Sequence, residues 1–238
     1  MSCDGTDRMQ LTQPRLVPRD AAISPDGQQV VFSAGESGIH YGDIYVVGTD
    51  GSPPRRIVQG HAIDATWSPD GNLLVLTSWT GDMSAPTDIF LEIYDMRTGK
   101  RSAVPSSQGV SFAEWAGQDT LVAAVRGATG LLSAFRTFNF KTGKWNDLFH
   151  LISGHLVNWV TTLDAKYLYA TTDAPDAPLL RIRLSDGHAE TVTSLKNFRR
   201  LTNPVTLYTR VNVAPDGSAV FTRDIGTEEI YALKLRWR

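Results

Sequence analysis

The sequence predicts an all-β fold, a β-propeller built from five four-stranded blades. Three observations support this prediction: a Ser-Pro-Asp-Gly turn recurs along the chain, a second series of glycine turns alternates with it, and short β-rich runs flank both series. The spacing of each series is close to the length of one propeller blade. No segment combines the period of a helix with the length of one. We therefore expect one propeller domain spanning residues 1–238.

The first turn series marks the turn between the first two strands of each blade. Ser24-Pro25-Asp26-Gly27 recurs as Ser68-Pro69-Asp70-Gly71 and as Ala214-Pro215-Asp216-Gly217, with degraded copies at residues 116–119 and 162–165. The third position of each copy falls at residues 26, 70, 118, 164 and 216, so the steps are 44, 48, 46 and 52 residues. Proline presets the backbone at the second turn position, and glycine accepts a left-handed conformation at the fourth. This series predicts a tight hairpin between the first two strands of each blade.

The second turn series falls between the copies of the first. Its members step by 46, 48, 44 and 44 residues, and they are Asp4-Gly5, Asp50-Gly51, Thr98-Gly99, Thr142-Gly143 and Asp186-Gly187. Apolar runs rich in β-branched and aromatic residues, such as Val30-Val31-Phe32 and Ile44-Tyr45-Val46-Val47, adjoin the turns. The turns and the apolar runs together predict that each unit has four strands, a to d, with tight a–b and c–d turns and a longer b–c loop.

The two ends of the chain are expected to complete one blade. Residues 8–12 have the pattern of a fourth strand, and residues 231–235 have the pattern of a third strand with none after it. If these strands pair, the approximate blades are residues 20–58, 62–106, 110–152, 156–196, and 208–238 plus 6–12. Closure of the ring would remove the unpaired sheet edge that invites aggregation. The alternatives are a six-bladed ring and an open fragment of a longer propeller.

Two stretches of the chain resemble known bacterial propellers. The segments Ala65–Leu73 and Asp43–Gly51 resemble the TolB-like propeller family, which is often six-bladed. The tail at residues 213–218 and 223–233 is similar to propellers that follow the winged helix of CadC-like transcriptional regulators. That resemblance implies a sensor or protein-interaction domain of a bacterial regulatory protein. These 238 residues hold no winged-helix sequence, so the resemblance implies no DNA binding by this domain.

Composition indicates a globular protein without a nucleic-acid partner. The net charge is -2, 42% of the residues are hydrophobic and 20% are charged, and no basic cluster suggests a phosphate-binding face. Apolar runs such as Leu73–Leu76 are too short to span a bilayer. Cys3 is the only cysteine, which excludes an intramolecular disulfide and a cysteine zinc site. We expect a monomer, periplasmic if it is fused to a transmembrane regulator and otherwise cytoplasmic.

The candidate binding site lies on the b–c rim, because the longer loops gather there and binding residues concentrate on loops held by a rigid scaffold. Alignment of the repeats places polar side chains at the mouth of the central channel, where we expect a protein or a small polar ligand. The predicted site residues are His61, His155, Asp64, Asn158 and Arg210 at the channel, with Trp79 and Tyr41 on or beside the loops. The alternative is that these aligned polar residues only bond neighbouring blades. No metal or cofactor is predicted.

The chain lacks the usual catalytic signatures. It contains no Gly-x-Ser-x-Gly elbow, no His-Glu-x-x-His helix and no phosphate-binding loop. We therefore predict no catalytic residues and a non-catalytic propeller for protein interaction or ligand sensing, as a module of a bacterial regulatory or envelope protein. The alternative function is a carbohydrate- or metal-dependent lyase or hydrolase that uses the central channel.

Overall fold

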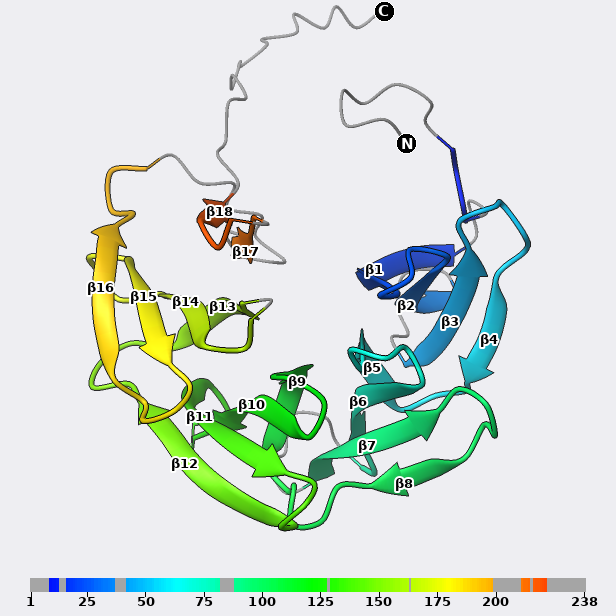
Figure 1. Cartoon of the computed structure of the whole chain (residues 1–238), viewed down its shortest axis with the longest axis horizontal. Coiled ribbons are helices and arrows are strands. Elements are labelled where there is room, and N and C mark those ends of the chain that lie inside the picture. The colour runs from blue at the N-terminus through cyan, green and yellow to red at the C-terminus, as the bar shows by residue number, and fades with distance from the viewer. Residues whose placement is uncertain are drawn as a thin grey trace, which may run out of the picture.

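Antiparallel β-sheets follow one another around a central axis and form an open arc (Figure 1). The computed structural model describes residues 9–12, 16–36, 42–81, 88–127, 129–162, 164–198, 211–214 and 216–221. Four of the sheets have four strands each, and in every one neighbouring strands in space are also neighbours in sequence. This meander topology is that of a propeller blade.

The strands follow the order that the turn series predict. Blade 1 contains β1 (Leu16–Ile23), β2 (Gln29–Glu36), β3 (Asp43–Gly48) and β4 (Arg55–Val58). Blade 2 contains β5 (Ala62–Trp67), β6 (Leu73–Trp79), β7 (Ile89–Asp95) and β8 (Arg101–Ala103). Blade 3 contains β9 (Val110–Trp115), β10 (Thr120–Arg126), β11 (Leu132–Asn139) and β12 (Lys144–His150). Blade 4 contains β13 (Leu156–Thr161), β14 (Tyr167–Thr172), β15 (Pro178–Arg183) and β16 (Ala189–Ser194), and a hairpin of β17 (Val211–Val213) and β18 (Ala219–Phe221) follows it.

The expected number of five complete blades is wrong, because the residues that the structure describes form four. Within the described ranges, the fifth unit contributes only the hairpin β17–β18. Residues 9–12, expected to belong to the closing strand, form no strand, and Leu11 packs instead against the apolar cluster of blade 1 that contains Phe32 and Tyr45. The expected partner, residues 231–235, lies outside the described residues. Formed by the described strands, the arc is open between β18 and β1 (Figure 1), which is compatible with the alternative of an open fragment. The turn sequences predict the period of the repeat from a few local residues. A strand also needs a neighbouring strand to take its backbone hydrogen bonds, and the turn sequences do not supply that neighbour.

The first turn series is confirmed as a repeated hairpin. Ser24 Oγ donates a hydrogen bond to Asp26 Oδ1 at 2.6 Å, and the Gly27 N–H donates to the Ser24 carbonyl at 2.9 Å. Ser68 and Asp70 make the same hydroxyl-to-carboxylate bond. Hydrogen bonds from Ser68 and Asn72 lower the pKa of Asp70 to about 2. The degraded copy at residues 162–165 keeps this geometry, with Ala165 at the position of the glycine and φ +53°.

Apolar faces of adjacent blades form the core. Val31 and Ile44 of blade 1 pack against Leu74 and Leu76 of blade 2, and equivalent clusters fill the seams between blades 2 and 3 and between blades 3 and 4. The indole N–H of Trp67 crosses the first seam and donates to the Ala22 carbonyl at 3.0 Å. In the part of the chain described, no helix has both the length and the apolar character needed to cross a membrane.

Candidate functional site

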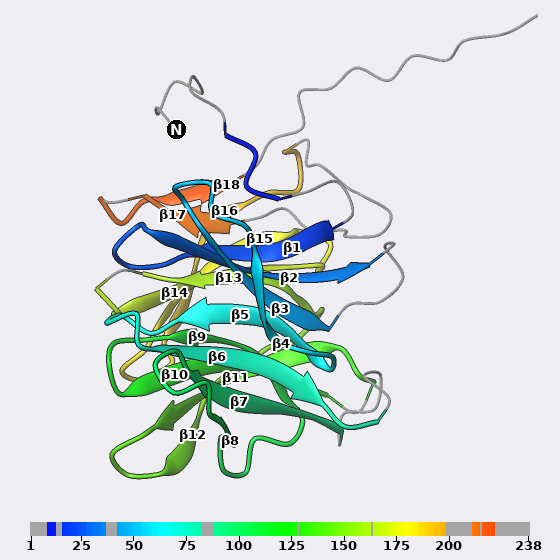
Figure 2. The same cartoon turned by 90° about the vertical axis from the view of Figure 1, so that its right-hand side faces the viewer.

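The two rims of the arc differ in their connections. Figure 2 shows the β1–β2 turn at one rim and the end of β2 at the other. Tight a–b and c–d turns therefore share one rim, here called the turn rim. The b–c loops and the links between blades share the opposite one, here called the loop rim. Every predicted site residue that the structure describes belongs to the loop-rim half of its strand or lies just before the strand.

His61 and Trp79 form a stacked pair on the loop rim. Their rings lie 5.5 Å apart, centroid to centroid, with planes 6° from parallel. His61 Nδ1 lies 3.2 Å from the Trp79 carbonyl oxygen, and the Trp79 N–H donates to the His61 carbonyl at 3.2 Å. His61 is exposed and Trp79 is half-buried at the end of β6. The structure thus brings these two predicted residues together and presents an imidazole to solvent.

Blade 1 holds this pair in place through two residues that the sequence analysis missed. A Cβ atom at Gly42 would lie 2.8 Å from the His61 nitrogen and 3.4 Å from the Trp79 ring, so only glycine fits there. Asp43 Oδ1 accepts a hydrogen bond from the Gly60 N–H at 2.6 Å, and Asp43 Oδ2 lies 3.0 Å from Arg56 Nη1. The only feature of the sequence that pointed to this role was Gly42 itself, a glycine directly before the third strand of the blade.

His155 occupies the corresponding position of blade 4 but has a different partner. Its backbone N–H donates to Asp173 Oδ1 at 2.6 Å, and its Nδ1 lies 3.0 Å from Asp173 Oδ2. Each histidine thus contacts the end of the second strand of its own blade, Trp79 in one case and Asp173 in the other. Across the described ranges, no group of three or more His, Cys, Asp or Glu side chains is arranged to hold a metal ion.

Asp64 and Asn158 lie on the innermost strands of blades 2 and 4. Asp64 sits where the pairing of β5 with β6 shifts register, with φ +56°, and Asp20 and Phe112 occupy equivalent bulges with φ +49° and +53°. Asn158 Oδ1 accepts a hydrogen bond from the Val211 N–H at 2.8 Å, which ties blade 4 to β17. The sequence analysis gave two roles for the aligned polar residues, ligand binding and bonding to a neighbouring blade. For Asn158 the structure shows a bond to the neighbouring unit. The remaining predicted residues, Tyr41 and Arg210, lie outside the described residues.

The loop rim also carries exposed aliphatic side chains that the sequence analysis did not single out. Ile152, in the link between blades 3 and 4, is fully exposed, with a relative exposure of 103%. Leu131, just before β11, is 49% exposed. The Leu151 N–H donates to the Ser133 carbonyl at 2.9 Å, so the two segments that carry Leu131 and Ile152 run side by side. The sequence feature that could have indicated this exposed surface was Ile152, an apolar residue in a link between blades.

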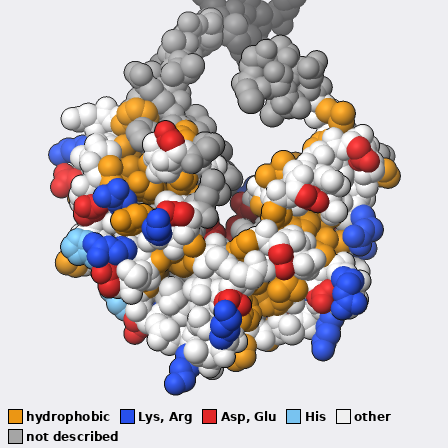
Figure 3. All heavy atoms as spheres, in the orientation of Figure 1, with side chains coloured by type: hydrophobic (Ala, Val, Ile, Leu, Met, Phe, Trp, Pro, Cys, Tyr) orange, Lys and Arg blue, Asp and Glu red, His pale blue; other side chains and the backbone are white. Residues whose placement is uncertain are grey.

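The turn rim carries a mixture of charged and apolar side chains. Acidic and basic side chains alternate over the face seen in Figure 3, with apolar side chains between them and acidic ones inside the central opening. The described residues form no basic patch on this face, in keeping with the net charge of -2. A hollow between blades 3 and 4 also opens on the turn rim, and its lining includes none of the predicted site residues.

Blades of four antiparallel strands around a central axis define the class of this protein, a β-propeller. Its fold is that of the TolB proteins: TolB from Acinetobacter baumannii superposes with a TM-score of 0.68 and 15% identity over 90% of this chain and 50% of that one. Putative TolB from Agrobacterium tumefaciens gives a TM-score of 0.61 and 15% identity over 77% of this chain and 64% of that one. The chain thus spans about half the length of the A. baumannii protein.

Peptidases share the fold over a smaller part of their length. A structure of prolyl endopeptidases matches with a TM-score of 0.58 and 13% identity, covering 84% of this chain and 31% of that one. A puromycin hydrolase matches with a TM-score of 0.53 and 16% identity, covering 84% of this chain and 32% of that one. The sequence matches no family model. At these identities the similarity establishes the propeller fold and leaves the activity open.

Proposed function

We propose that this chain is a non-catalytic protein-interaction propeller that contacts its partner through the loop rim. The observation that carries the proposal is the full exposure of Ile152, on a segment that runs next to the one carrying the half-exposed Leu131. Exposed apolar side chains on neighbouring segments of one rim are a feature of protein-binding surfaces. Removal of these two side chains from water on binding would contribute about 1.5–3 kcal/mol for each one that becomes fully buried.

The polar residues of the same rim fit the border of such an interface. His61 is exposed and stacks on Trp79, and His155 is held by Asp173. Protein interfaces combine an apolar centre with a polar border, and aromatic residues are enriched among those that dominate binding energy. The loop rim offers both kinds of side chain on a rigid set of strand ends.

Two features support a role without catalysis, and a third supports a role in a regulatory protein. Each predicted histidine is paired with one residue of its own blade, and no third titratable side chain joins either pair among the hydrogen bonds of the described residues. The peptidase neighbours resemble this chain over about a third of their own length. The similarity of residues 213–218 and 223–233 to regulator-fused propellers supports the finer proposal that the chain is a sensor or interaction module of a bacterial regulatory protein.

The proposal is tested by charge substitutions on the two rims. The loop-rim variant combines Leu131→Asp with Ile152→Asp, and the matched control is Ile23→Asp, which changes an aliphatic side chain 62% exposed at the turn rim. A partner purified on the wild-type protein should bind the loop-rim variant at least about tenfold more weakly, because two apolar contacts are lost. It should bind Ile23→Asp unchanged. Equal binding to all three proteins, or selective loss with Ile23→Asp, would place the interface elsewhere.

A metal measurement tests the absence of catalysis in the channel. Elemental analysis of the purified protein should find no stoichiometric transition metal. A bound metal that is lost from the double variant His61→Ala and His155→Ala would contradict the proposal and favour a metal-dependent enzyme.

A further inference from the structure

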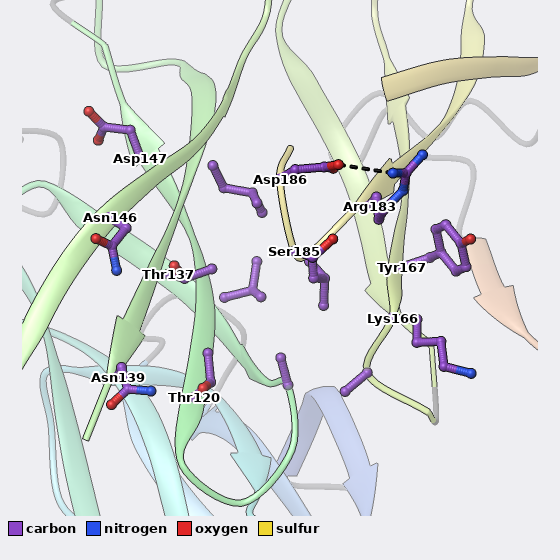
Figure 4. A pocket seen from close by; sticks show the side chains of 15 residues that line it. Thr120, Thr137, Asn139, Asn146, Asp147, Lys166, Tyr167, Arg183, Ser185 and Asp186 are labelled. Carbon is purple, nitrogen blue, oxygen red and sulfur yellow. Dashed lines mark hydrogen bonds and ion pairs between the residues drawn. The ribbon is translucent and has the colours of Figure 1, made fainter. Parts of the chain in front are cut away.

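A hollow of about 620 Å³ lies between blades 3 and 4 and opens on the turn rim (Figure 4). Strands β10, β11 and β12 of blade 3 form one wall, and the two tight turns of blade 4 form the other. This volume lies within the roughly 300–1,000 Å³ that is typical of small-molecule sites. The hollow is on the opposite rim from the proposed protein interface.

A contact of backbone on backbone fixes the separation of the two walls. Gly187, in the c–d turn of blade 4, lies so near β12 that a Cβ atom would come within 1.8 Å of the Leu148 carbonyl oxygen. Leu148 and Leu184, one from each wall, both line the hollow. The turn of blade 4 therefore rests directly on the outer strand of blade 3, and the space between them is set by rigid elements.

The charged side chains around the hollow are paired with one another. Arg183 Nη1 lies 2.9 Å from Asp186 Oδ2, the pair marked by the dashed line in Figure 4. Lys166 Nζ lies 3.2 Å from Asp164 Oδ2, and Asp147 Oδ1 lies 3.0 Å from Arg136 Nε. The hollow thus offers a ligand no unpaired charge among the described residues that line it.

Neutral hydrogen-bonding groups line both walls. The side chains of Thr120, Thr137, Asn146 and Ser185 face the hollow, and none makes a hydrogen bond to another residue that the structure describes. Asn139 uses its Oδ1 to accept the N–H groups of Lys141 and Thr142, so its amide NH₂ group remains as a donor. Figure 4 shows Thr120, Thr137, Asn139 and Asn146 on one wall and Ser185 on the other.

Apolar side chains and the aromatic ring of Tyr167 complete the lining between these polar groups. The apolar side chains are Ala116, Val122, Leu148, Ala165 and Leu184. The lining therefore combines neutral donors and acceptors with apolar surface, and the described residues that form it bring no free charge.

We propose that this hollow binds an uncharged, hydroxyl-rich small molecule, such as a monosaccharide or disaccharide. Hydroxyl groups both donate and accept hydrogen bonds, which suits a mixture of threonine and serine hydroxyls with asparagine amides. The C–H faces of a sugar ring suit the apolar lining, and a charged ligand would lose its hydration without gaining an unpaired counter-charge. This site is a second binding function, independent of the loop rim.

The test is a titration of the labelled protein, followed by the NMR signals of the asparagine side-chain amides. The uncharged probes are methyl α-glucoside, maltose and N-acetylglucosamine, and the charged comparators are glucuronate and glucosamine. At least one uncharged probe should shift the amide signals of Asn139 and Asn146 in a saturable way at millimolar concentration. The charged comparators should shift them less.

A matched pair of variants shows whether binding occurs in the hollow. Thr137→Val removes one lining hydroxyl with little change of shape, and it should weaken binding about 2- to 10-fold, the loss expected for one neutral hydrogen bond. Thr191→Val makes the same change on β16, outside the hollow, and should leave binding unchanged. The proposal is overturned if no uncharged probe shifts either amide, if a charged comparator binds more tightly, or if Thr137→Val and Thr191→Val bind alike. None of these results would bear on the loop-rim interface.

Discussion

Gly143 and Gly187 occupy the same position in the c–d turns of blades 3 and 4, with φ +65° and +71°. Both therefore need the left-handed conformation that glycine adopts without cost. They differ in their surroundings: nothing lies within 4 Å of a Cβ atom at Gly143, whereas a Cβ atom at Gly187 would overlap the Leu148 carbonyl. A repeated residue thus has a local role in one blade and an additional role at a seam in the next.

This difference predicts the outcome of one substitution made at two positions. Gly143→Ala should destabilise the fold by about 1 kcal/mol, the cost of a left-handed alanine. Gly187→Ala should cost roughly 2–4 kcal/mol, because overpacking against the backbone adds to the same conformational cost. Urea unfolding of the two variants measures both values. Equal destabilisation would show that blade 4 does not rest on β12 as described.

Among the elements, the seam between β9 and β13 contains a desolvated carboxyl group. Glu114 of β9 accepts a hydrogen bond from the Thr161 N–H of β13, with 2.6 Å between Oε2 and the nitrogen. Loss of hydration raises the pKa of Glu114, and the hydrogen bond from Thr161 opposes this only in part. A carboxyl group with a raised pKa binds its proton more tightly in the folded state than in the unfolded state.

The seam therefore predicts a pH-dependent effect of Glu114→Gln. Wild-type stability should fall as the pH rises from the ordinary glutamate value of 4.5 towards the raised folded-state pKa, because the unfolded chain then holds fewer protons than the folded one. The glutamine side chain of the variant does not titrate, so the variant should gain stability relative to wild type over that interval. Thermal unfolding from about pH 4 to about pH 8, a range that begins below the ordinary glutamate pKa, measures the difference. A difference that stays constant across this range would contradict the raised pKa.

At the scale of the whole molecule, the part of the arc that the structure describes has unequal ends. Blade 1 is a complete sheet, whereas the hairpin β17–β18 has two strands of three residues each and a half-exposed Val220. Packing of Val211 and Val213 on blade 4, together with the bond from the Val211 N–H to Asn158, connects the hairpin to the rest. In arrays whose units contact only their neighbours, a small terminal unit opens more easily than the middle ones.

Hydrogen exchange should therefore be faster in β17 and β18 than in β10 and β11. Asn158→Ala removes the acceptor of the Val211 N–H and should accelerate exchange at Val211 further, without affecting β10. Asn146→Ala is the matched control, because that side chain makes no hydrogen bond to another described residue. Protection in β17 equal to that in β10, or unchanged by Asn158→Ala, would contradict this account of the terminal hairpin.

The sequence by itself determined the repeat, the strand order and the chemistry of the turns. Asp26, Asp70 and Gly99 could be assigned because turn conformation depends on the few residues that form the turn. The tertiary structure alone decided the number of complete blades, the pairing of His61 with Trp79 and of His155 with Asp173, and the hollow between blades 3 and 4. Each of these depends on contacts between segments far apart in the chain, and no local pattern encodes which backbone lies opposite Gly187 or which donor reaches Asn158.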